Sequence, residues 1–184
     1  MTTATTTSGR RKWLLGAAGV AAAAVGAGLA LRKQMATAPT PLSPAANAFW
    51  AARFERPTAG TELIAADLRG QPLLLNFCAT WCAPCVKELP ELAQFEREFK
   101  ARGWRVMALA VDAPTPVREF LQKLPLDFAV GLAGLTGTEL ARTLGNSQGG
   151  LPFSVAFAAS GEVIWHKLGA TNLEELRQLG RQVT

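Results

Sequence analysis

Short apolar runs alternate with amphipathic segments from residue 73 onward, and this alternation predicts an α/β domain. Residues 73–77 and 106–111 are apolar runs bounded by turn residues, which is typical of buried strands. Between them, from 83 to 102, apolar residues recur every three or four positions. This period predicts a helix that ends at Gly103. Strands and helices in alternation favour a parallel sheet with helices on both faces.

The segment after the second strand predicts two helix starts and one brief strand. In Asp112–Pro116, Thr115 is the expected N-cap and Pro116 the first helical residue. Residues 128–130 are expected to form a third strand. Thr136 stands three positions before a glutamate, a capping-box pattern that predicts the start of a short helix.

The C-terminal part predicts a hairpin and a final helix. Residues 153–158 and 162–167 flank the turn Ala159-Ser160-Gly161 and are expected to pair in antiparallel fashion. Thr171 and Glu174 form a second capping box, which predicts the start of the last helix. The expected fold class is therefore α/β, a three-layer α/β/α sandwich with a mixed sheet.

An uncharged stretch, residues 13–31, precedes the domain. Its 19 residues are about the length of a membrane-spanning helix, and the three basic residues at 10–12 predict a cytoplasmic N-terminus and an exported remainder. A signal peptide is the alternative, because the stretch is rich in Ala and Gly and Ala36-Thr37-Ala38 fits a cleavage site. Pro39 fits badly after such a site, which favours an anchor.

The chain is expected to contain four segments. These are a basic region (1–12), a span or signal (13–31), a proline-containing linker (32–45) and one domain (46–184). Three aromatic residues near the end of the linker are expected to dock a short helix onto the domain: Phe49, Trp50 and Phe54.

The net charge of +5 is concentrated in the N-terminal third of the chain. Residues 1–60 carry seven basic residues and one acidic residue, a net of +6, so the remainder has a net charge of −1. Binding to a nucleic-acid backbone needs a basic face, which a nearly neutral domain does not offer. The charge distribution argues against a nucleic-acid partner.

The motif Trp81-Cys82-Ala83-Pro84-Cys85 lies where the first strand passes into its helix. At a helix N-terminus the macrodipole favours the Cys82 thiolate, the form that attacks disulfides. Cys85, one turn later, can resolve the mixed disulfide. The alternatives are a static disulfide and half of a zinc site, but four zinc ligands would require all three cysteines and the single histidine, His166.

Residues 76–85, Asn-Phe-Cys-Ala-Thr-Trp-Cys-Ala-Pro-Cys, and Gly150-Leu151-Pro152 resemble the TlpA/ResA-like membrane-anchored thioredoxins of the redoxin family. The resemblance implies a thioredoxin-like fold and a cis peptide between Leu151 and Pro152, which faces the cysteines and binds the substrate as an added strand. Substrate recognition is then expected around Trp81, Pro84, Leu151 and Pro152.

The same resemblance suggests roles for other residues near the motif. Glu88 matches an acidic residue beside the cysteines of this branch, and Pro90 matches its helix proline. Ordinary thioredoxins have a buried Asp where this chain has Asn76, so Glu88 is the expected base for Cys85. An isolated helix Glu is otherwise a solvated side chain. Cys78 replaces the usual aromatic residue and is expected to be a buried apolar side chain, with a third redox thiol as the alternative.

The predicted function is a thiol-disulfide oxidoreductase that reduces disulfides of exported proteins, the role of relatives in cytochrome c or copper-centre maturation. The resemblance implies a membrane electron donor, a location in the inner membrane with the domain in the periplasm, and no cofactor besides the Cys82–Cys85 disulfide. A disulfide-forming oxidant, a peroxiredoxin-like peroxidase and a copper(I)-delivery protein are the alternatives.

Overall fold

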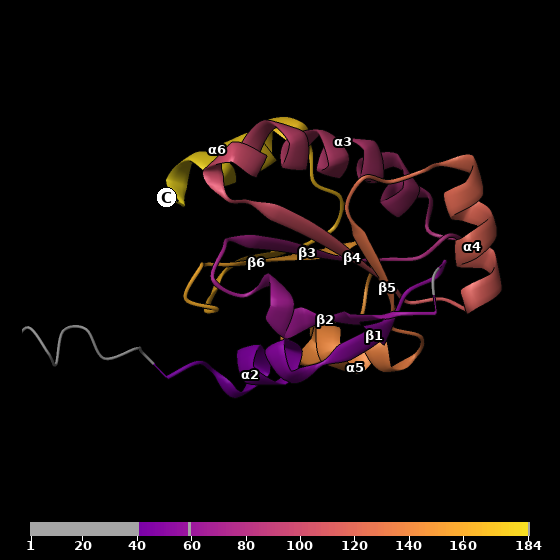
Figure 1. Ribbon diagram of the computed structural model, residues 1–184, viewed down its shortest axis with the longest axis horizontal. Coiled ribbons are helices and arrows are strands. Elements are labelled where there is room, and N and C mark those ends of the chain that lie inside the picture. Colours follow the sequence, from indigo (N-terminus) through magenta and orange to yellow (C-terminus); the bar gives the residue numbers. More distant parts are fainter. Residues whose placement is uncertain (1–40, 59, 184) are drawn as a thin grey trace, which may run out of the picture. The chain divides into compact units, whose positions relative to one another are not determined.

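A mixed seven-stranded sheet forms the centre of the computed structural model, which describes residues 41–58 and 60–183 (Figure 1). The strands are β1 Arg53–Glu55, β2 Glu62–Ile64, β3 Leu73–Cys78, β4 Arg105–Ala110, β5 Ala129–Leu132, β6 Phe153–Phe157 and β7 Val163–Leu168. The helices are α2 Pro44–Ala51, α3 Ala83–Phe99, α4 Pro114–Lys123, α5 Thr136–Thr143 and α6 Leu173–Gln182, with 3₁₀ turns at Ala65–Leu68 and Lys100–Arg102.

The strand order is β2-β1-β5-β4-β3-β6-β7. Strands β3, β4 and β5 are parallel, β6 pairs antiparallel with β3, and β7 pairs antiparallel with β6. The predicted mixed α/β sandwich and its C-terminal hairpin are therefore confirmed. The antiparallel pair β1–β2 was not predicted, because each strand has only three residues and too short an apolar pattern.

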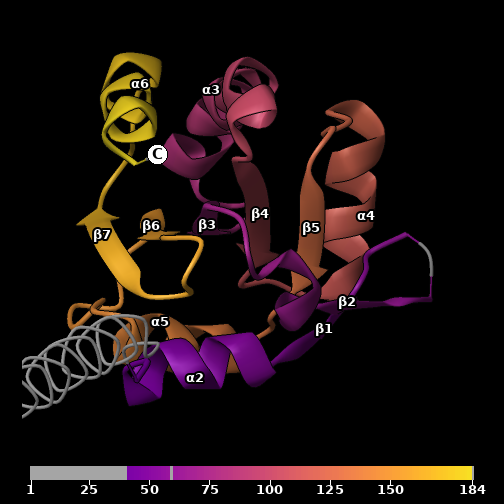
Figure 2. The same ribbon diagram turned by 60° about the vertical axis from the view of Figure 1, so that its left-hand side comes forward.

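Helices cover both faces of the sheet (Figure 2). Strand β3 is buried along its whole length, and its side chains alternate between two apolar clusters. Leu73, Leu75 and Phe77 belong to the cluster beside α2 and α5. Leu74 and Cys78 belong to the cluster beside α3, α4 and α6. The polar residue Asn76 lies between Leu74 and Cys78 in this alternation, so its side chain is on the same face of the sheet and faces α3.

Three predicted helices begin within one or two residues of the expected position, but the predicted N-caps are corrected by the structure. Helix α4 begins at Pro114, so Thr115 lies inside the helix and is not its N-cap. The Thr136 hydroxyl donates to the carbonyl of Ala133 (2.8 Å) and caps no amide. The N-cap of α6 is Asn172 and not Thr171. Differences of one or two residues are usual at helix ends, because the terminal turns fray.

A short helix docks on the domain near residue 45, as expected. Phe49 and Trp50 of α2 are buried, and the Trp50 indole N–H donates to the carbonyl of Gly161 (2.7 Å). Phe54 is also buried, but on strand β1. The segment 13–31 lies outside the described residues. Within 41–58 and 60–183, no helix is long and apolar enough to cross a membrane.

Candidate active site

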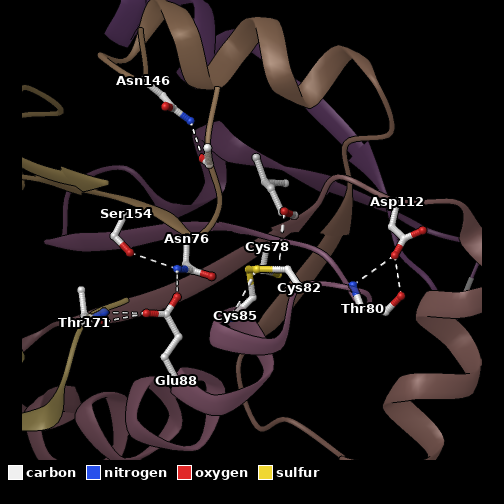
Figure 3. Close-up of a disulfide and its surroundings, with 12 residues drawn as sticks. Asn76, Cys78, Thr80, Cys82, Cys85, Glu88, Asp112, Asn146, Ser154 and Thr171 are labelled. Atoms are coloured by element: carbon white, nitrogen blue, oxygen red, sulfur yellow. Dashed lines mark hydrogen bonds between the residues drawn. A yellow bond between two sulfur atoms is a disulfide. The ribbon is translucent and has the colours of Figure 1, made fainter. Parts of the chain in front are cut away.

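Cys82 and Cys85 form a disulfide at the N-terminus of α3, where Cys82 is the N-cap (Figure 3). The backbone N–H of Cys85 donates to the Cys82 sulfur (3.4 Å), so a free amide of the first helical turn faces that atom. Cys85 is completely buried, whereas Cys82 lies beside Trp81, which is 70% exposed. Cys82 is thus the cysteine nearer to solvent, as an attacking thiol must be.

Glu88 is buried one turn beyond Cys85 and accepts hydrogen bonds on both carboxyl oxygens (Figure 3). Oε1 accepts from the Asn76 side-chain amide (2.7 Å). Oε2 accepts from the backbone N–H (2.7 Å) and the hydroxyl (3.1 Å) of Thr171. The carboxyl group therefore connects α3 to strand β3 and to the loop before α6. It is not the solvated side chain that an isolated helix Glu usually is.

Burial raises the pKa of Glu88 above its ordinary value. The hydrogen bonds from Thr171 and Asn76, and the positive charge of Lys167, oppose this rise but do not cancel it. A carboxyl group of this kind changes its protonation state closer to neutral pH than a solvated one. It can therefore exchange a proton under conditions in which an ordinary glutamate stays ionised.

Asn76 connects the Glu88 carboxyl group to strand β6. Its amide nitrogen donates to Glu88 and also to the Ser154 hydroxyl on the paired strand β6 (3.0 Å). The Asn76 oxygen is buried and has no hydrogen-bond partner among the described residues. Figure 3 shows this oxygen on the side of Asn76 that faces the cysteine pair.

A cleft of about 1030 Å³ opens beside the disulfide. Trp81, Cys82, Pro84 and Leu151 all line this cleft. The predicted cis peptide between Leu151 and Pro152 is confirmed. Of the residues expected at the substrate site, Trp81, Pro84 and Leu151 line the cleft, whereas Pro152 is buried behind it.

Comparison with known sequences gives the family of this chain. The Redoxin family profile matches residues 43–182. The chain belongs to the redoxin family. Its relatives include the thiol-disulfide oxidoreductase ResA of Bacillus cereus, with 31% identity over 126 residues that cover 68% of this chain and 70% of the relative. This redoxin is of the ResA/TlpA-like kind, and it is a thiol-disulfide oxidoreductase.

Solved structures have the same fold. One is a candidate thiol:disulfide interchange protein DsbE from Chlorobium tepidum, with 27% identity and a TM-score of 0.60 over 72% of this redoxin and 91% of that chain. A second is a thioredoxin-family thiol:disulfide interchange protein from the same organism, with 24% identity and a TM-score of 0.63 over 80% of this redoxin and 97% of that chain. The two comparisons support the thioredoxin-like fold class.

Cys78 lies at the end of β3 in the redoxin core. Desolvation by burial, and the negative charges of Glu88 and Asp112, raise its pKa to about 12. At neutral pH roughly one such thiol in 10⁵ is ionised, and only the thiolate attacks disulfides. The structure favours the buried apolar side chain over the third redox thiol. Across the part of the chain that is described, no cluster of three or more potential metal ligands occurs.

Thr171 is the site residue that the sequence pattern misassigned. Its position three residues before Glu174 suggested a helix cap, but its amide and hydroxyl both bind Glu88. The two residues are 83 positions apart, so no local pattern could have indicated their contact. Only the packing of α6 beside α3 brings them together (Figure 1).

Proposed function

We propose that this redoxin reduces disulfides of exported proteins, in the maturation of cytochrome c or of copper centres. The observation that carries the proposal is the buried Glu88 carboxyl, held by Asn76 and Thr171 one turn after Cys85. A reductant must activate its buried second cysteine during every turnover. A static disulfide needs no such group.

The reaction begins with the reduced pair. The Cys82 thiolate attacks one sulfur of the target disulfide, which forms a mixed disulfide and releases one target thiolate. Cys85 then loses its proton and attacks the Cys82 sulfur. The Cys82–Cys85 bridge forms, the second target thiolate leaves, and both thiolates are protonated. Two electrons pass from the protein to the target.

Glu88 receives the Cys85 proton in this scheme. Burial favours the neutral carboxyl and raises its pKa, whereas the bonds from Asn76 and Thr171 stabilise the ionised form that accepts the proton. A positioned general base of this kind contributes about 10²- to 10⁴-fold to a rate. The Asn76 oxygen, which has no partner among residues 41–58 and 60–183, can accept from the Cys85 thiol before that proton moves.

The proposed setting is the periplasmic side of the inner membrane. Residues 13–31 would anchor the chain, and a membrane reductase would return two electrons to the Cys82–Cys85 bridge after each turnover. A fusion of alkaline phosphatase to the C-terminus tests the location. It should be active in cells and should stay with the membrane fraction at high pH. A fusion that is produced but stays inactive would contradict this part of the proposal, because alkaline phosphatase forms its disulfides only outside the cytoplasm.

The reduction potential of the Cys82/Cys85 couple is the measurement that tests the direction. We expect the full-length protein in detergent to have a potential near that of thioredoxin, about −270 mV, and to reduce insulin disulfides. A potential near −120 mV would instead identify a disulfide-forming oxidant.

Two cysteine variants test the order of attack. Cys82→Ser should abolish the reduction of insulin, whereas Cys85→Ser should accumulate a mixed disulfide that non-reducing electrophoresis detects. Cys78→Ser is the matched control and should behave like the parent protein. Mixed disulfides through Cys85 would contradict the order. Tight copper(I) binding without thiol exchange would favour copper delivery.

A further inference from the structure

The end of α5 and the loop that leads to β6 line the same cleft as Trp81. After α5, Gly145 has a left-handed backbone (φ +115°), which lets the chain turn back on the helix. The backbone N–H of Asn146 then donates to the carbonyl of Ala141 (3.0 Å) and closes the helix end. The position of Asn146 is thereby fixed by α5.

The Asn146 side chain is buried and fastens this loop. Its amide nitrogen donates to the carbonyl of Gly150 (2.8 Å), and its own backbone carbonyl accepts from the N–H of Gly149 (3.2 Å). Two hydrogen bonds of Asn146, one donated and one accepted, therefore close the loop formed by residues 146–150. Figure 3 shows the Asn146 amide pointing to the loop segment that leads toward Ser154.

The hydrogen bonds of Asn146 hold residues that line the substrate cleft. Asn146, Gly149, Gly150 and Leu151 all line the cleft that contains Cys82. The hydrogen bond from the Asn146 side chain to Gly150 therefore helps to hold the cleft backbone beside Leu151.

The Asn146 amide is only partly satisfied by hydrogen bonds. Its side-chain oxygen has no hydrogen-bond partner among the described residues, and the residue is only 2% exposed, so this oxygen is buried. A buried polar atom without a partner is destabilising, and a half-satisfied amide is a poorer choice for a core position than an apolar residue. The hydrogen bond from the amide nitrogen to Gly150 offsets this cost.

We propose that Asn146 is a positioning residue for peptide substrates. By holding the Gly150 carbonyl it sets the backbone of Gly149–Leu151 so that an extended target chain can lie along this segment, with its disulfide at Cys82. The inference rests on the proposed function in that the target is a polypeptide disulfide. A small disulfide without a peptide backbone needs only access to Cys82, and its reaction is independent of Asn146.

The test compares two substrates in three variants of the full-length protein. Asn146→Ala removes the bond to Gly150, and Asn146→Asp keeps the shape of the side chain while an ionised carboxylate cannot donate. Asn47→Ala is the matched control, because the Asn47 amide also donates to a backbone carbonyl, that of Leu42 (3.1 Å), but is exposed on α2. The substrates are insulin and the small aromatic disulfide 5,5′-dithiobis(2-nitrobenzoic acid).

We expect kcat/KM for insulin to fall about three- to tenfold in both Asn146 variants, mainly through KM, which corresponds to the loss of one ordinary hydrogen bond. The rate with the small disulfide and the reduction potential should stay within error of the parent values. Asn47→Ala should match the parent on both substrates. As pH falls, the deficit of Asn146→Asp relative to the parent should shrink, because a protonated carboxyl can donate to Gly150 again. The deficit of Asn146→Ala should not change.

Equal losses on both substrates would overturn the inference, since they would reflect damage to the cysteine pair. An unchanged kcat/KM for insulin would overturn it as well. If Asn146→Ala does not fold, the pH dependence of Asn146→Asp decides, and a deficit that stays constant with pH counts against the proposal. If the parent protein itself fails to reduce insulin, the proposed direction is wrong. The same comparison is then made with a reduced dithiol peptide and the oxidised protein.

Discussion

Replacing Thr171 with valine tests whether the loop before α6 stabilises the ionised form of Glu88. The change keeps the size of the side chain and removes only the hydroxyl, which donates to Glu88 over 3.1 Å. The backbone N–H of Thr171 keeps its own bond to the same oxygen (2.7 Å). Thr171→Ser is the matched control, because it retains the hydroxyl.

The expected loss depends on pH. A hydrogen bond to a charged group contributes about 1.5–3 kcal/mol, and one to a neutral group contributes about 0.5–1.5 kcal/mol. The pKa of Glu88 is raised in the folded protein, so its contribution to stability is greatest below its ordinary value of 4.5 and is lost as pH rises through the raised value. Thr171→Val raises that pKa further. The difference from the parent therefore grows with pH and levels off once the carboxyl is ionised in both proteins.

Urea unfolding of the oxidised protein, followed at pH 4 and pH 8, measures this difference. We expect Thr171→Val to lose about 1.5–3 kcal/mol of unfolding free energy at pH 8 and about half as much at pH 4. Thr171→Ser should stay close to the parent at both values. The reasoning is refuted if valine and serine give the same loss, or if the loss from valine is as large at pH 4 as at pH 8.

Three further changes test the site and the core. Glu88→Gln should slow the release of the mixed disulfide by about 10²-fold and leave the first attack by Cys82 nearly unchanged, which stopped-flow measurement of both steps can check; equal slowing of both would contradict its role at Cys85. Cys78→Ala should keep insulin reduction within about twofold, and the Cys78 thiol, with its pKa near 12, should resist iodoacetamide in the folded protein; rapid labelling at pH 7 would contradict its burial. Gly180→Ala should destabilise the protein by about 1–3 kcal/mol in thermal unfolding, although alanine favours helices, because a Cβ there would lie 2.6 Å from the Phe99 ring; a rise in Tm would show that α6 can shift away from α3.

Local patterns predicted the elements that carry the cysteines. Strand β3 and helix α3 have continuous apolar or helical periods, and their junction places Cys82 at the N-cap without any help from distant residues. The resemblance to a known family added the cis peptide before Pro152 and pointed to Glu88. These features depend on residues that are close in the sequence or on a motif.

The features that were missed depend on contacts between distant elements. Thr171 reaches Glu88 across 83 positions, and a capping pattern suggested a different role for it. Asn146 resembles an ordinary loop asparagine until the cleft is known. Strands β1 and β2 are stabilised by pairing with each other and with β5 more than by their own short sequences. Packing decided each of these outcomes, and a single sequence does not encode packing in any local pattern.

The exposed indole of Trp81 provides this redoxin with an internal optical probe. The ring is next in sequence to the disulfide and largely in solvent, whereas Trp50 and Trp104 are buried elsewhere in the fold. An excited indole beside a sulfur–sulfur bond can lose its energy by passing an electron to that bond, so opening the bridge should brighten its emission. Redox titrations, and the kinetics of each half-reaction, can then be followed by intrinsic fluorescence without a dye. Trp81→Phe identifies the part of the signal that comes from the active site.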